Sequence, residues 1–172
     1  EANSVAVAVA NRNIQAEGRA ALGLARIFVQ RGADRQDITG EFNRAIQLLR
    51  DDVRDYAGLR STYYYWAQYY LDQQEPQLAF DRLAEAQRQA AFVGDTRGEA
   101  LIHLQVGEAR IRNRDFDIAV REYQAALSKF QQATDVRGEA TALLALGDIQ
   151  FSRAQYVTAL DTFEQMRLAY VT

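Results

Sequence analysis

His103 is the side chain in this sequence that could most readily move a proton near neutral pH, and it is the single histidine of the chain. Because the sequence has no cysteine, a metal site would need His103 together with clustered carboxylates, which its neighbours do not provide at a ligand spacing. No serine or basic partner stands at a triad spacing, and no phosphate-binding glycine loop or paired-histidine zinc motif occurs. We therefore expect no catalysis, no metal and no cofactor, and we predict that His103 packs in the core.

A run of aromatic residues is the second feature that could do chemistry, because the bases of single-stranded nucleic acids stack on such rings. The run spans Tyr63 to Trp66 and continues at Tyr69 and Tyr70. Stacking platforms of this kind lie in basic grooves, whereas this chain has a net charge of −3 and a pI near 5.2. We therefore expect no nucleic-acid partner. We predict that Tyr63, Trp66 and Tyr70 pack in the core and that Tyr64 points away from it.

Charge and hydropathy also bear on membranes and on the compartment. An anionic membrane surface attracts basic chains, so the acidic balance gives this chain no preference for one. The longest apolar stretch near the start, from Val5 to Ala10, is far shorter than a membrane span and lacks the basic flank of a secretion signal. Because the chain begins with Glu1 and not with methionine, we expect a processed or excised piece of a longer chain. We predict no membrane insertion, and we leave the compartment open with the cytoplasm slightly favoured.

The elements that carry these candidates are predicted to be helices. The chain contains one proline, Pro76, and ten glycines, so residues that form turns and interrupt helices are few, while good helix formers abound. Apolar residues recur at three- and four-residue intervals, as in Ala100, Leu104, Gly107 and Ile111. This spacing predicts an all-α protein.

An internal repeat of forty residues organises most of the chain. The segment from Asp95 to Ala100 returns as the segment from Asp135 to Ala140, and the same interval backwards reaches Asp55 to Gly58. Further positions keep the same step, namely Gly107 with Gly147, Phe116 with Tyr156, Ala119 with Ala159, and Tyr123 with Phe163. Each unit therefore reads as two helices joined by a tight turn, with the second helix beginning near Phe116 or Tyr156.

Two residue types have expected structural roles in each unit. The aspartate that opens a unit suits a helix N-cap, because its carboxylate can accept hydrogen bonds from free amide groups at the helix start. The glycine three residues later has no such obvious role as a cap. Gly107 and Gly147 are expected to let the two helices of a unit lie close together, so that a larger side chain there would wedge them apart.

This pattern resembles the tetratricopeptide repeat family, in a long form with a period of about forty residues. The family has a large residue, Leu-Gly and an aromatic on the first helix, and small, aromatic and small residues on the second. The matching positions, unit by unit, are Tyr63, Trp66, Ala67, Tyr70, Ala79, Leu83 and Ala86; His103, Val106, Gly107, Phe116, Ala119, Tyr123 and Ala126; and Leu143, Leu146, Gly147, Tyr156, Ala159 and Phe163. The sequence departs from the family pattern at Pro76, Arg110, Gln150 and Met166.

The resemblance implies one domain over residues 1–172, built as a right-handed superhelical solenoid of antiparallel helical hairpins with about 3.5 to 4 repeats. Its repeats would be 55–94, 95–134 and 135–172. A degenerate first hairpin in 1–54, with helical runs around 13–31 and 37–54, would act partly as a cap.

The first helix of each unit lines the concave face in this family, and helical spacing selects the residues that would face a ligand there. They are Tyr64, Gln68 and Asp72; Leu104, Glu108 and Arg112; and Leu144, Asp148 and Ser152. Glu108 and Asp148 stand where family members that clamp a carboxylate carry asparagine, so that function is disfavoured. Two carboxylates suit a ligand with positive charge, although a purely solvated role for them stays an equal alternative.

Two functions follow from the resemblance. The first is a scaffold that binds a protein segment or peptide in the concave groove, where the two carboxylates suit a partner of basic character. The alternative is a ligand- or peptide-sensing regulatory module of a larger signalling or transcriptional protein. The last helix adds an expectation about assembly, because it carries Tyr156, Leu160, Phe163 and Tyr170 and no polar capping helix follows Thr172. We expect either a continuing chain or a homo-oligomer formed through this C-terminal end.

Overall fold

The computed structural model describes residues 2–52 and 54–169 and contains only helices and turns within them. The helices are α1 (Ala2–Arg31), α2 (Arg35–Gln47), α3 (Tyr56–Asp72), α4 (Pro76–Val93), α5 (Thr96–Arg112), α6 (Phe116–Gln132), α7 (Val136–Ser152) and α8 (Tyr156–Ala169). A π-helical segment, η1 (Leu48–Asp52), extends α2. The predicted all-α class is confirmed, and no described helix combines the length and hydropathy of a membrane span.

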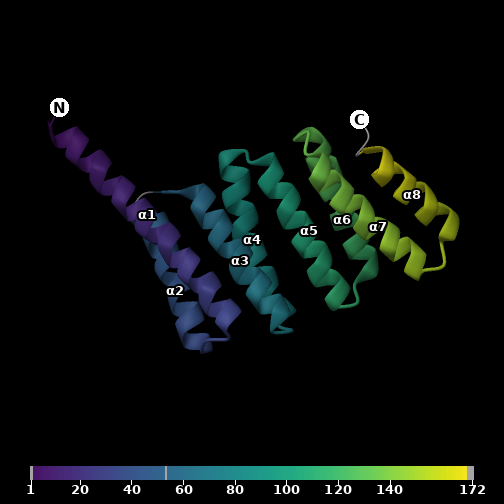
Figure 1. Cartoon of the computed structure of the whole chain (residues 1–172), viewed down its shortest axis with the longest axis horizontal. Helices are drawn as coiled ribbons and strands as arrows, with labels where there is room; N and C mark the ends of the chain where they lie inside the picture. The colour runs from purple at the N-terminus through teal and green to yellow at the C-terminus, as the bar shows by residue number, and fades with distance from the viewer. Residues whose placement is uncertain (1, 53, 170–172) are drawn as a thin grey trace.

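Successive helices pack side by side, and the stack progresses from α1 at one end to α8 at the other (Figure 1). The closest packing joins α1 with α2, α3 with α4, α5 with α6, and α7 with α8. Each odd-numbered helix also contacts the next odd-numbered helix, so that α1 contacts α3, α3 contacts α5, and α5 contacts α7. Within the described part of the chain, no two even-numbered helices are in contact. The odd-numbered helices therefore lie closer together than the even-numbered ones.

One turn recurs at the end of every odd-numbered helix. In each turn a backbone amide donates to the carbonyl oxygen of the residue five positions earlier, at 2.8 to 3.0 Å. The donor and acceptor pairs are Ala33 with Phe28, Glu75 with Tyr70, Asp115 with Arg110, and Gln155 with Gln150. In the last three turns the residue before the amide donor has a positive φ, with values from 59° to 64°. We align the four units on this turn. Residues of different units are called equivalent when they lie the same number of positions along the chain from the carbonyl acceptor of their turn, and we call this alignment the repeat register. The first unit obeys the same register, although its sequence does not match the forty-residue repeat.

The expected helix starts are confirmed. Asp55, Asp95 and Asp135 precede α3, α5 and α7, and each carboxylate accepts a hydrogen bond from the amide of the glycine three residues later, at 3.0, 2.7 and 3.0 Å. Pro76 begins α4, where a missing N–H costs no helical hydrogen bond. The expected run from residue 13 starts much earlier, because α1 begins at Ala2.

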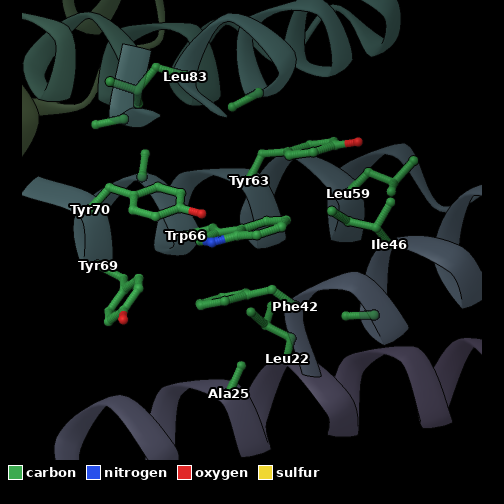
Figure 2. Packing of buried hydrophobic residues seen from close by; sticks show 14 of the residues in the cluster. Leu22, Ala25, Phe42, Ile46, Leu59, Tyr63, Trp66, Tyr69, Tyr70 and Leu83 are labelled. Carbon is green, nitrogen blue, oxygen red and sulfur yellow. The ribbon is translucent and has the colours of Figure 1, made fainter. Parts of the chain in front are cut away.

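The largest core lies in the first five helices. Phe42 of α2 stacks on Trp66 of α3 with centroids 5.3 Å apart, and Trp66 stacks on Tyr70 at 5.9 Å (Figure 2). Tyr63, Trp66 and Tyr70 are 5 to 6 % exposed, which confirms their expected packing role. Leu22 and Ala25 of α1 complete this cluster. The first hairpin is therefore an integral part of the main core.

Glycines allow the helices of the last two pairs to lie close together, as expected. A Cβ atom on Gly107 would lie 2.5 Å from Cε1 of Tyr123, and a Cβ on Gly147 would overlap the ring of Phe163. At the far end, α8 buries only Ala159 and Thr162 among its described residues. Tyr156 and Leu160 are exposed there, and Tyr170 lies outside the described residues.

Candidate functional site

The odd-numbered helices carry a row of equivalent polar residues that face a series of pockets. Two residues before the carbonyl acceptor of the turn, the chain has Arg26, Gln68, Glu108 and Asp148 in the four units. Two residues after it, the chain has Gln30, Asp72, Arg112 and Ser152. We call these eight residues the polar row. Six of them belong to the set expected from sequence, whereas Arg26 and Gln30 of α1 do not.

Members of this row line four pockets, one of which Arg112 borders together with Leu71, Gln74 and Pro76, and the other three follow the row from α1 to α7. The first, of about 170 Å³, lies between α1 and α3 and is lined by Arg26, Gln30, Gln68 and Asp72 among others. The second, of about 150 Å³, lies between α3 and α5 and includes Gln68, Asp72, Glu108 and Arg112. The third, of about 380 Å³, is bordered by Asp148 and Ser152 of α7 together with residues of α5 and α6. Every member of the polar row therefore lines at least one pocket.

Two of the expected site residues have a different environment. Leu104 is half-buried and packs against the clusters that join α5, α6 and α7. Tyr64 is half-buried too, with its ring edge-on to that of Tyr65 at 5.4 Å and its hydroxyl 3.5 Å from Nε2 of Gln68. Burial raises the pKa of Tyr64, so its hydroxyl stays protonated at neutral pH. Tyr64 therefore contacts the polar row through Gln68, whereas Leu104 packs between helices.

Arg112 holds the centre of the row together. Its Nη2 lies 2.7 Å from Oε1 of Glu108 and 3.7 Å from Oδ1 of Asp72, and its Nη1 donates to the carbonyl oxygen of Leu71. The guanidinium thus links the end of α3 to the end of α5. The carboxylate of Glu108, which was expected to face a ligand's positive charge together with Asp148, already shares one internal cation with the carboxylate of Asp72. Two carboxylates against one guanidinium leave this pocket with an excess of negative charge.

Asp148 and Gln105 each carry an acceptor atom without a partner among the described residues, but only that of Asp148 is exposed. Within the described residues, Asp148 is exposed and makes no hydrogen bond or ion pair. Gln105 is buried and lines the pocket between α3 and α5, and its Oε1 has no hydrogen-bond partner there. Beside them, burial raises the pKa of Tyr123 to about 12, and the negative charges of Glu108 and Asp148 contribute to the shift. The exposed carboxylate of Asp148 suits a ligand that donates hydrogen bonds.

A series of ion pairs joins each odd-numbered helix from α1 to α5 to the next odd-numbered helix. Each capping aspartate is also paired with an arginine of the preceding odd-numbered helix. Arg19 lies 2.9 Å from Asp55, Arg60 lies 3.0 Å from Asp95, and Arg97 lies 2.6 Å from Asp135. The carboxylate that caps one helix therefore also joins it to the previous unit.

The structure also explains why a glycine stands three residues after each capping aspartate. A Cβ on Gly58 or Gly98 would meet the carboxylate of the capping aspartate, and one on Gly138 would meet the ring of Phe130. The position must be glycine because the cap and the preceding unit both approach the backbone there.

His103 has no metal-binding partners among the described residues, where no group of three potential ligands gathers. Its Nδ1 lies 2.8 Å from Oε2 of Glu122, and its side chain is 19 % exposed. The pair links α5 to α6, which is close to the expected packing role but adds a polar contact to it.

Comparison of the sequence with protein-family models and with curated proteins finds no match. Conclusions about the function of the polar row therefore rest on its own geometry.

Sequence reasoning missed Arg26 and Gln30 for an identifiable reason. The repeat search follows identical residue types at a forty-residue step, whereas Phe28 precedes Tyr70, its equivalent in the next unit, by forty-two residues. Alignment on the turn instead of on the aspartate motif would have found them. Arg26 also places its guanidinium over the ring of Tyr65, 4.2 Å from the centroid, which orients it along the row.

Proposed function

We propose that the chain is a right-handed superhelical solenoid of the tetratricopeptide type that binds a segment of another protein along its odd-numbered helices. The recurring turn and the small residues Gly107 and Gly147 support this assignment. The contacts between odd-numbered helices support it as well, because a stack whose odd-numbered helices lie closer together curves toward that side. Such stacks leave an extended concave surface for partners.

The observation that carries the proposal is the succession of pockets along the polar row. Equivalent residues line them at intervals of one unit, from Arg26 in α1 to Asp148 in α7. A surface that repeats along the stack suits an extended or helical segment, whereas a small molecule would need one enclosed pocket with converging groups.

The charges along the row indicate where the charged residues of the ligand lie. Arg26 places positive charge at the α1 end, and the pair of Asp72 and Glu108 around Arg112 leaves a net negative charge in the middle. Asp148 adds an unpaired carboxylate toward α7. We expect a polypeptide whose basic residues lie over α5 and α7, held there by charge-assisted hydrogen bonds.

The test uses peptides selected from a displayed random library on the wild-type chain, with affinities measured by fluorescence anisotropy. Reversing Glu108 and Asp148 to arginine replaces two attractive groups by two repulsive ones. The affinity of selected peptides should fall at least tenfold, and wild-type binding should weaken with salt because the pairs are partly exposed.

A control pair, Asp81→Arg with Asp161→Arg, makes the same change of net charge on the even-numbered helices α4 and α8, where both residues are exposed. Peptide affinity should be unchanged in this control. If the control weakens binding as much as the groove variant does, or if no peptide is selected, the polar row is not the binding surface.

A further inference from the structure

The joint between the third and fourth units has two apolar halves. One half comes from α5 and α6 and consists of Leu104, Ile111 and Val120, which pack with buried Tyr123 in one cluster. The other half comes from α7, where Leu146 and Ile149 are buried in the same cluster, at 5 % and 6 % exposed. We call the first the trailing face of a unit and the second the leading face of the next unit.

The C-terminal end of the stack presents a trailing face with nothing on it in the described residues. In the repeat register, Leu144, Phe151 and Leu160 are equivalent to Leu104, Ile111 and Val120. They are 45 %, 61 % and 62 % exposed, whereas their equivalents in the third unit are partly buried in the joint. Apolar side chains of this size gain free energy when water is removed from them.

The N-terminal end presents the complementary leading face. Leu24 and Ile27 of α1 are equivalent to Leu146 and Ile149 of α7, because each lies at the same distance from the carbonyl acceptor of its turn. Leu24 is 40 % exposed and Ile27 is 45 % exposed. The N-terminal part of α1 projects away from the rest of the stack (Figure 1).

We propose that copies of this chain associate head to tail, with the leading face of α1 in one copy packed on the trailing face of α7 and α8 in another. The two ends carry the two halves of a joint that the chain already forms between its own units, so a second copy continues the existing packing. The polar residues that meet at the rim, Ser152 of one copy and Gln30 of the other, correspond to Asp72 and Arg112 and bring no like charges together.

This association is heterologous, because the two faces that meet are different surfaces of the chain. Each copy keeps one free leading face and one free trailing face after the first contact. Such interfaces build rings when the rotation closes and open filaments when it does not. The inference does not depend on the polar row or on its ligand.

Single substitutions block one face at a time. Leu160→Asp places a charge in the trailing face and Ile27→Asp places one in the leading face. Both positions are exposed within one copy, so the fold should survive, which circular dichroism and a thermal melt check. The matched control is Leu168→Asp on α8, because Leu168 is 54 % exposed and its equivalent, Ser128, is exposed outside the joint.

Sedimentation velocity over a series of concentrations tests the proposal on the 172-residue chain. The wild type and Leu168→Asp should form larger species as concentration rises, and Leu160→Asp and Ile27→Asp should each remain monomeric. An equimolar mixture of these two should form a dimer and nothing larger, since only one intact leading face and one intact trailing face can meet. A wild type that stays monomeric overturns the proposal, as does a Leu160→Asp or Ile27→Asp chain that self-associates like the wild type. A mixture without dimers overturns it too.

Discussion

Gly107 is one of the residues at which two helices approach each other too closely for a larger side chain. The ring of Tyr123 occupies the space where any side chain at position 107 would begin, and Tyr123 is itself buried between α5, α6 and α7. The ring cannot move outward without disturbing Leu146 and Ile149, which pack in the same cluster. Alanine, which adds a single methyl group at position 107, is therefore a sensitive probe of the packing.

We predict that Gly107→Ala lowers the free energy of unfolding by about 1 to 3 kcal/mol through overpacking against Tyr123. The matched control is Gly40→Ala in α2, where a Cβ meets no atom within 4 Å. That change should raise the free energy of unfolding by about 0.4 to 1 kcal/mol, because it restricts the unfolded chain without a native cost. Urea unfolding followed by circular dichroism measures both. Equal effects of the two substitutions would contradict this account of the site.

Arg112 shows at the same scale how one residue sets the charge of the candidate site. Its guanidinium is shared between two carboxylates and a backbone carbonyl, so it neutralises part of the negative charge that the groove would otherwise offer. Asp148 has no such partner among the described residues. The proposed preference for a basic ligand therefore depends mainly on Asp148 and on the negative charge of Asp72 and Glu108 that Arg112 does not neutralise.

At the scale of the helix, the capping aspartates combine local and long-range stabilisation. Asp135 accepts from the amide of Gly138 at 3.0 Å and pairs with Arg97 at 2.6 Å. The Gly138 amide, and then Arg97, hold the pKa of Asp135 below its ordinary value of 3.8. The ionised form is favoured in the folded protein, so its contribution to stability is present above that value and is lost as the pH falls through the lowered pKa.

We predict that Asp135→Ala costs about 0.5 to 2 kcal/mol of the free energy of unfolding at neutral pH, as the loss of an N-cap does. Asp135→Asn is the control, because asparagine also caps helices but carries no charge for Arg97. It should cost less, and its deficit relative to the wild type should shrink as the pH falls below 3.8. Urea unfolding at several pH values measures both. A deficit of Asp135→Asn that does not change with pH would show that the ion pair contributes nothing.

At the scale of the whole molecule, packing is uneven along the stack. The aromatic core of Phe42, Trp66 and Tyr70 joins the first units, and α3 buries side chains along its whole length. By contrast, α8 buries only Ala159 and Thr162 in its described residues and packs on α7 alone. In a linear stack, stability is the sum of unit and neighbour contributions, so an end helix with few buried residues opens first.

We therefore predict that backbone amides of α8 exchange with solvent fastest and those of α3 slowest among the helices α3 to α8. Hydrogen exchange followed by mass spectrometry measures this. The experiment is best made on the Ile27→Asp chain, in which no second copy can cover α8 through the proposed joint. Protection of α8 equal to that of α3 would contradict the inference that stability is concentrated in the first units.

The sequence by itself determined the helical class, the pairing of helices from residue 55 onward and the caps at Asp55, Asp95 and Asp135. These features depend on interactions within a few residues of one another, such as apolar spacing along one helix and a carboxylate next to free amides. The same local information placed Tyr63, Trp66 and Tyr70 in the core and Gly107 against the second helix of its unit. Six members of the polar row followed from helical spacing together with the family resemblance.

Only the tertiary structure decided which of these residues are free to act. The pairing of Asp72 with Arg112, the packing of Leu104 and the inclusion of Arg26 in the row depend on how closely neighbouring units approach. That approach is set by side chains about forty residues apart, and no local pattern encodes it. The exposed halves of a joint at the two ends emerged for the same reason, because a leading or trailing face is recognisable only once the internal joint has been seen.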